Sequence, residues 1–170
     1  PASTADWYLT AHNVVDNNFI HDGGKLFRAA CGVFLGGSAS DGAEGVELDP
    51  QGRVCVGGMT YSADFPVTVG AFQKRFAGAR NPHGPLWGGG DGTVTVFSPD
   101  LSQLLFSSYM GGSGEDLFRA CAVTARGEIV LVGSTTSTDF PVLNAQQPAP
   151  AGGPDEVIVV KLRPISAKTN

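Results

Sequence analysis

Short apolar segments, separated by glycine, proline and aspartate, follow one another along most of this chain. Alternation with a period of two between turn residues is typical of β-strands. We therefore expect strands at residues 45–48, 53–59, 92–97 and 104–109, and again at 120–123, 128–132 and 157–162. Residues 129–132 and 157–160 are continuously apolar and β-branched, which indicates strands buried on both faces. No segment has a convincing helical pattern.

The N-terminal part of the chain predicts an arm followed by a hairpin. Residues 1–12 have no clear period, but Trp7 and Tyr8 within them are candidates for docking on a neighbouring surface. A possible strand at 13–20 leads to His21-Asp22-Gly23-Gly24, where glycine allows the backbone of a tight turn. Residues 25–35 are expected to form the returning strand.

The central pattern occurs twice, with one constant offset in the sequence numbering (111 minus 36 is 75). The matched pairs are Gly36/Gly111, Asp41/Asp116, Gly52/Gly127, Gly58/Gly133, Thr60/Thr135 and Phe65/Phe140. Pro99 and Pro164 match with a smaller offset (164 minus 99 is 65), so the second long connection is shorter by 10 (75 minus 65). Such a repeat indicates a supersecondary unit stacked on copies of itself.

Four short antiparallel strands per repeat, with both faces buried, predict the blades of a β-propeller. The fold class is therefore all-β: about two four-stranded antiparallel blades plus an N-terminal hairpin, an incomplete ring by itself. A two-sheet sandwich is the main alternative. It does not explain why the fourth strand enters the next copy through the same Gly-Gly-Ser each time.

Several motifs in these repeats resemble a known family. They are Tyr/Phe-x-Gly-Gly-Ser with an aspartate three residues later, the Asp-Pro-Gln-Gly turn, Val-x-Val-Gly-Gly-x-Thr, and Ser-x-Asp-Phe-Pro-Val. Together, over about residues 25–164, they resemble the bacterial seven-bladed β-propeller repeat family called SBBP. In the second copy Thr124-Ala125 replaces the Asp-Pro of the turn. The resemblance implies propeller blades, an extracytoplasmic location (periplasmic, secreted or cell surface) and no assigned catalytic residues.

Two blades are too few for a closed ring, because propellers typically have four to eight. We divide the chain into an N-terminal arm and strand (1–24), a first blade with its preceding strand (25–110), and a second blade without a fourth strand (111–170). The chain begins at Pro1, which suggests a processed chain or a piece of a longer one. The missing blades would come from other protein chains or from identical copies, and residues 25–35 could complete a last blade in its own ring or a neighbour's.

Composition narrows the class of partner. The chain has 170 residues, 24 of them glycine and 11 proline, and a formal net charge of -5 without a basic run. The charge argues against binding to nucleic acid, and no apolar stretch approaches the roughly 18 residues that a membrane helix needs. The three cysteines Cys31, Cys55 and Cys121 lie in strand-like runs and are interpreted as small buried hydrophobic residues, at most one pair of which could form a disulfide.

The usual catalytic motifs do not fit. Ser38 and Ser113 lack the final glycine of a Gly-x-Ser-x-Gly nucleophile elbow. The glycine-rich residues 88–92 lack the lysine of a phosphate-binding loop and precede a strand. His12, His21 and His83 are scattered, so we predict neither a metal site of histidines nor a cofactor, and we expect no enzymatic activity.

The recurring acids have a structural interpretation. Asp41, Asp64, Asp116 and Asp139 are expected to bind backbone amides in turns. Calcium near Asp116 and Glu115 stays open as an alternative. Phe65-Pro66 and Phe140-Pro141 are expected to fill the space between blades.

The connection at residues 72–87 concentrates basic and aromatic side chains in an otherwise acidic chain. Its candidate partner contacts are Phe72, Arg75, Phe76, Arg80, His83 and Trp87, although a loop folded over its own blade explains them equally well. We expect a non-catalytic interaction or scaffold protein, a structural subunit of a larger assembly. The alternative is a module that binds carbohydrate or another small ligand, or a hydrolase, with Asp41, Glu44, Asp116 and Arg119 converging at the ring axis.

Overall fold

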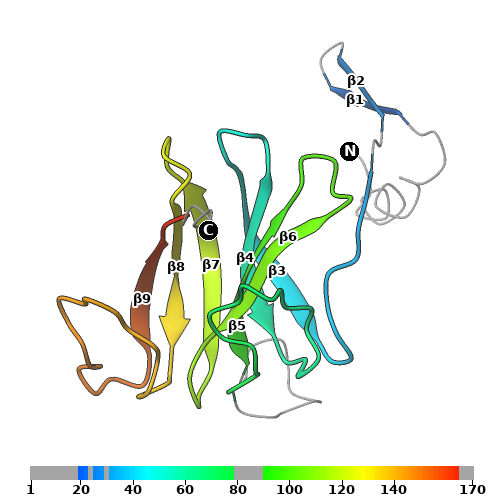
Figure 1. Ribbon diagram of the computed structural model, residues 1–170. Helices are drawn as coiled ribbons and strands as arrows, with labels where there is room; N and C mark the ends of the chain where they lie inside the picture. The colour runs from blue at the N-terminus through cyan, green and yellow to red at the C-terminus, as the bar shows by residue number, and fades with distance from the viewer. Residues whose placement is uncertain (1–18, 23–24, 29–30, 79–89, 165–170) are drawn as a thin grey trace, which may run out of the picture. The chain divides into compact units, whose positions relative to one another are not determined.

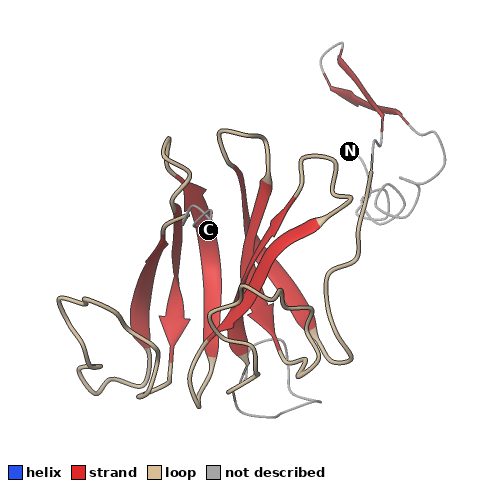
Figure 2. Cartoon of the chain, viewed as in Figure 1, coloured by secondary structure: helices blue, strands red, loops and turns tan. Residues whose placement is uncertain are grey.

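The structure, a computed structural model, describes residues 19–22, 25–28, 31–78 and 90–164. Every regular element in these ranges is a β-strand, and none of the residues described is helical (Figure 2). The all-β prediction is therefore confirmed. By its internal contacts the chain divides into two compact units, Pro1–Val33 and Phe34–Asn170.

The first unit contains an antiparallel hairpin of β1 (Phe19–Asp22) and β2 (Lys25–Arg28). A hairpin here was predicted, but β1 continues through His21 and Asp22, which were expected in the turn, and residues 31–35 of the predicted range 25–35 are not strand. Residues 13–18 and 29–30 of the predicted strands lie outside the part that the structure describes. The turn of the hairpin, residues 23–24, lies outside it as well. Residues 31–37 have no regular secondary structure.

The second unit contains two antiparallel sheets (Figure 1). The first has the order β3 (Asp41–Leu48), β4 (Val54–Thr60), β5 (Asp91–Phe97) and β6 (Leu104–Met110). The second has the order β7 (Asp116–Val123), β8 (Ile129–Thr135) and β9 (Glu156–Leu162). Within each of these sheets, every strand thus pairs with the next one in sequence, although a long connection separates the second strand from the third.

The two sheets have the same register. Ala43 lies opposite Gly58 in the first sheet, and Phe118 lies opposite Gly133 in the second. A β-bulge follows at Glu44 and at Arg119, where the pairing shifts by one residue. The repeat in the sequence therefore corresponds to a repeat of the three-dimensional structure, including the position of the β-bulge.

The sheets pack against each other through β7, which contacts β3, β4 and β5. The buried core between them consists of Val94, Met110, Phe118, Leu131 and Ile158. Glycine allows this close approach: a Cβ at Gly57 would lie 2.8 Å from Cδ2 of Leu131, and one at Gly45 would lie 2.5 Å from the backbone nitrogen of Cys121. Burial of this apolar core is the main source of stability for the pair of sheets.

Two sequence predictions need correction. Residues 129–132 and 157–160 are strands, but they are buried on one face only: Leu131 and Ile158 are buried, whereas Val132, Val157 and Val159 are exposed. Also, β3 and β7 begin four residues before the predicted ranges, because the acids at their starts pair with the ends of β4 and β8. Two sheets of four and three strands are present, and the described residues do not form a closed ring.

Candidate functional site

The recurring carboxylates organise the loop at the start of each sheet. Asp41 accepts hydrogen bonds from the Gly37 amide (2.9 Å) and from the hydroxyls of Thr60 and Ser62 (2.5 and 3.2 Å). Asp64 accepts hydrogen bonds from both the amide and the hydroxyl of Ser38, at 2.8 and 2.9 Å. These bonds lower the pKa of Asp64.

The second sheet repeats this loop. Asp116 accepts hydrogen bonds from the Gly112 amide (2.7 Å), the Ser137 hydroxyl (2.8 Å) and the Thr135 hydroxyl. Asp139 accepts hydrogen bonds from the amide and hydroxyl of Ser113, which lower its pKa. Burial raises the pKa of the fully buried Asp116, against these hydrogen bonds. The prediction that the four acids bind backbone amides in turns is confirmed.

A second pair of acids was missed by sequence reasoning. Asp91, the first residue of β5, accepts hydrogen bonds from the Ala77 amide (2.7 Å) and from the side chain of Gln73 (2.9 Å). Glu156, the first residue of β9, accepts them from the amides of Ala151 and Gly153, at 2.8 and 3.4 Å. Each acid thereby attaches the long connection to the third strand of its sheet. The available signal was their offset (156 minus 91 is 65), which is the same as that of the prolines after these strands.

Asp91 is the least satisfied of these acids. It is fully buried, and within the described ranges its Oδ1 atom has no hydrogen-bond partner. Burial raises the pKa of Asp91 to about 6, and the negative charge of Asp116 adds to the effect. An unpaired buried oxygen costs stability, so Asp91 is a weak point of the first connection.

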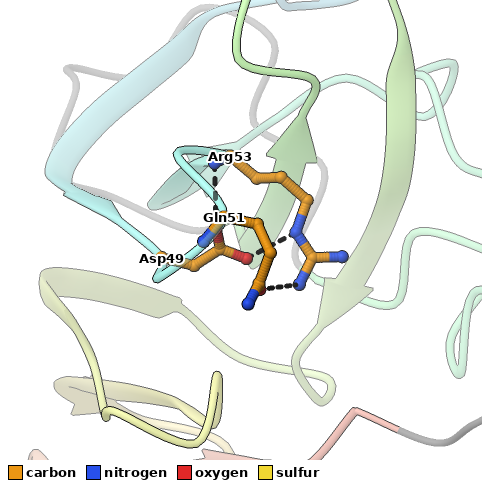
Figure 3. A network of polar contacts seen from close by, with 3 residues as sticks. All are labelled: Asp49, Gln51 and Arg53. Atoms are coloured by element: carbon orange, nitrogen blue, oxygen red, sulfur yellow. Dashed lines mark hydrogen bonds and ion pairs between the residues drawn. The ribbon is translucent and has the colours of Figure 1, made fainter.

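The hairpin turns between the first and second strands also match. In the first sheet, Asp49 accepts hydrogen bonds from the amides of Gln51 and Arg53 and pairs with the Arg53 guanidinium (Figure 3). Although burial opposes it, this set of bonds lowers the pKa of Asp49. In the second sheet the hydroxyl of Thr124 accepts from the amides of Arg126 and Glu128, at 3.3 and 3.2 Å. A hydroxyl therefore takes the place of the carboxylate, and the turn geometry is kept.

The four residues of the ligand-binding alternative have different surroundings in the part described. Asp41 and Asp116 are each bonded within their own loops. Glu44 and Arg119, the two bulge residues, form an ion pair across the sheets at 3.8 Å. A groove of about 470 Å³ contains Arg119 but none of the other three; it is lined by Glu115, Leu117, Arg119, Ser134, Thr136, Asp155, Glu156 and Val157.

The predicted partner contacts are described only in part. Phe72 lies against Phe106 with ring centroids 5.7 Å apart, and Phe76 against Tyr109 at 6.1 Å. These two rings therefore contact their own sheet, but Phe72 is also 49% exposed, and Arg75 is exposed. Trp7, Tyr8, Arg80, His83 and Trp87 lie outside the described residues.

The remaining candidates for chemistry have ordinary surroundings. Within the ranges described, no group of three His, Cys, Asp or Glu residues could hold a metal, and no helix is suited to cross a membrane. All three cysteines are free. Cys55 is buried and Cys121 half-buried, but Cys31 is exposed and lies outside any strand, so its interpretation as a buried residue of a strand was wrong. Burial raises the pKa of both the Cys55 and Cys121 thiols to about 11, so these two react slowly as nucleophiles.

The most conspicuous surfaces are the outer faces of the two sheets. On the second sheet, Val157 and Val159 of β9 are exposed, and on the first, Val46 and Leu48 of β3 are exposed. Exposed contiguous apolar residues of this kind mark interaction sites in soluble proteins.

No protein-family model matches the sequence, and no curated protein matches it either.

Proposed function

We propose that this chain is a non-catalytic scaffold of stacked propeller blades, which binds other protein chains through the outer faces of its two sheets. Such a protein would be a structural subunit of a larger assembly. Its resemblance in sequence to extracytoplasmic repeat proteins supports a place outside the cytoplasm.

The observation that carries this proposal is a contrast between two equivalent residues. Val94 lies opposite Gly57 in the first sheet, and Val159 lies opposite Val132 at the same position of the second. Val94 is 0% exposed because the second sheet covers it, whereas Val159 is 67% exposed. A face that is core in one repeat is therefore open to solvent in the next.

The polar chemistry supports a structural role for the loops. The recurring acids and the serines of the Gly-Gly-Ser motifs bind one another and backbone amides, as described above. Groups bonded in this way hold the loops in place and are poorly disposed to attack a substrate. The arrangement favours binding through apolar faces over catalysis.

The test is the solution mass of the full chain, measured by light scattering after size exclusion. We expect a discrete multimer, and we expect Val159→Glu or Val46→Glu to reduce its mass to that of one chain. Both side chains are exposed within a single chain, so the folded monomer should survive these changes. Val69→Glu, at a still more exposed apolar residue of a loop, is the control and should leave the multimer intact. A folded, monodisperse wild-type monomer would refute the proposal.

A further inference from the structure

The connection between the two sheets shows how a further sheet would be joined to the stack: a fourth strand of one sheet continues into the first strand of the next. The first sheet ends in β6, which continues through Gly111-Gly112-Ser113 into β7 of the second sheet. Residues 31–35 continue in the same way through Gly36-Gly37-Ser38 into β3. By the offset that relates these two motifs, Phe34 corresponds to Tyr109 and Leu35 to Met110. Residues 31–35 are thus equivalent to a fourth strand that precedes β3.

The state of this segment differs from that of β6. Tyr109 and Met110 are 1% and 7% exposed, whereas Phe34 is fully exposed and Val33 is 49% exposed. Residues 31–35 also have no regular secondary structure. The segment has apolar side chains at the positions where β6 buries its own, but it lacks the sheet that would bury them.

The edge of β9 is the matching acceptor. In the first sheet β5 pairs with β6, but among the described residues β9, its equivalent, pairs only with β8. In the first sheet, hydrogen bonds from the long connection also hold the fourth strand. The Phe65 amide donates to the Tyr109 hydroxyl (3.0 Å), and the Thr68 amide donates to the Ser107 carbonyl (3.0 Å). The equivalent of Thr68 in the second sheet is Leu143, which is exposed.

The exposed faces also complement each other in size. At the internal junction, a Cβ on Gly92 would lie 2.7 Å from the Phe118 ring, so a large side chain meets a glycine. At the equivalent positions of the open faces, Val157 replaces Gly92 and Ala43 replaces Phe118. A larger residue on one face is therefore matched by a smaller one on the other, as close packing requires.

The charges repeat in the same manner. Glu44 and Arg119 occupy equivalent bulges and pair across the internal junction. If a second copy stacked its first sheet on the second sheet of this chain, its Glu44 would face Arg119 again. Opposite charges would then alternate at every junction, which favours this chain as its own partner.

We propose that a second copy of this chain is the occupant, and that it donates its residues 31–35 as the fourth strand to β9 while its β3–β6 sheet covers the outer face of β7–β9. The inference rests on the proposed function and names its partner. A single mode of docking thus adds a fourth strand to β9, covers the apolar face of β7–β9 and pairs Glu44 of one copy with Arg119 of the other. The contact is head-to-tail, and such contacts generate a ring when the rotation from copy to copy closes. About two to four copies would supply the four to eight sheets of a typical propeller.

The register of the first sheet provides a test by disulfide formation. Val96 lies opposite Phe106 in β5 and β6. Their equivalents are Lys161 of β9 and Cys31, so a donated strand would place Cys31 of one copy opposite Lys161 of the next. Opposed residues of neighbouring strands lie close enough for a disulfide. The full-length Lys161→Cys variant is therefore oxidised and its covalent species are separated without reductant.

We expect most of the Lys161→Cys protein to become covalent multimers whose largest species has the mass of the assembly in solution. Lys161→Cys combined with Cys31→Ser should lose these species, which excludes bonds through the less reactive Cys55 and Cys121. Lys161→Ser should keep the wild-type assembly mass, which controls for loss of the 2.7 Å ion pair with Glu128. Multimers without covalent bonds would overturn strand donation by a second copy but leave the scaffold function standing. A wild-type chain that is a folded monomer would overturn both.

Discussion

Replacing Asp116 with alanine tests whether the buried carboxylate holds the start of the second sheet. Asp116 is fully buried and accepts hydrogen bonds from the Gly112 amide, the Ser137 hydroxyl and the Thr135 hydroxyl. Alanine leaves three buried donors without this acceptor, and each unsatisfied buried donor costs about 1–3 kcal/mol. Burial already penalises the charge of Asp116, which reduces the net loss. We therefore expect the free energy of unfolding to fall by about 3–4 kcal/mol.

The assay is urea denaturation followed by far-UV circular dichroism, with all variants at one protein concentration because association would shift the midpoint. Asp116→Asn keeps the size and one acceptor oxygen, so it should cost about half as much as alanine. Asp41→Ala removes the equivalent set of bonds at a partly exposed site, where water replaces the carboxylate. It should therefore cost clearly less than Asp116→Ala. A loss below about 1 kcal/mol for Asp116→Ala, or equal losses at both sites, would refute the reasoning.

Two further changes test the buried charge and the junction between the sheets. Asp91 has its pKa raised from 3.8 to about 6, so its charge opposes folding above pH 6, and this penalty disappears as the pH falls from about 6 towards 3.8. Asp91→Asn should therefore stabilise the protein at pH 7 and remove this part of the pH dependence in thermal unfolding; an unchanged profile would contradict it. Gly57→Val should cost about 1–3 kcal/mol by contact with Leu131. Adding Leu131→Val should restore at least half of the loss in a double-mutant cycle, and additive losses would contradict the packing.

Much of the fold could be predicted because the sequence contains the repeat twice, and residues that match between the two copies indicate positions with the same structural role. A glycine at position 58 or 133 is required where a Cβ would collide with the opposite strand, at the carbonyl of Gly42 in the first sheet and of Leu117 in the second. Such positions are visible in the sequence as matched glycines. The matched acids were predictable for the same reason, since Asp41 and Asp116 meet the same donors.

The parts that could not be predicted depend on contacts between distant segments. Residues 41–44 are Asp-Gly-Ala-Glu, without an alternating pattern, and they are strand because β4 pairs with them. The roles of Asp91 and Glu156 were hidden because the two acids differ in type and the long connections differ in length. Burial of residues 157–160 on both faces was wrongly expected. The apolar side chains at 157 and 159 show that this face of the strand can be buried, but they do not show whether another part of the same chain covers it.

The distribution of satisfied and unsatisfied groups indicates where a partner would bind. The loop acids are bonded within their own sheets: Asp64 and Asp139 hold the Gly-Gly-Ser loops, and Glu156 holds the second connection. The outer face of β9 presents Val157 and Val159 to solvent, and each such side chain gains about 1.5–3 kcal/mol when buried. The internal junction already shows that this face, in its first copy, is covered by a sheet of the same repeat. The gain in free energy on binding would therefore come from burial of the outer faces of the two sheets. An apolar sheet that packs on β9 would bury Val157 and Val159 in this way.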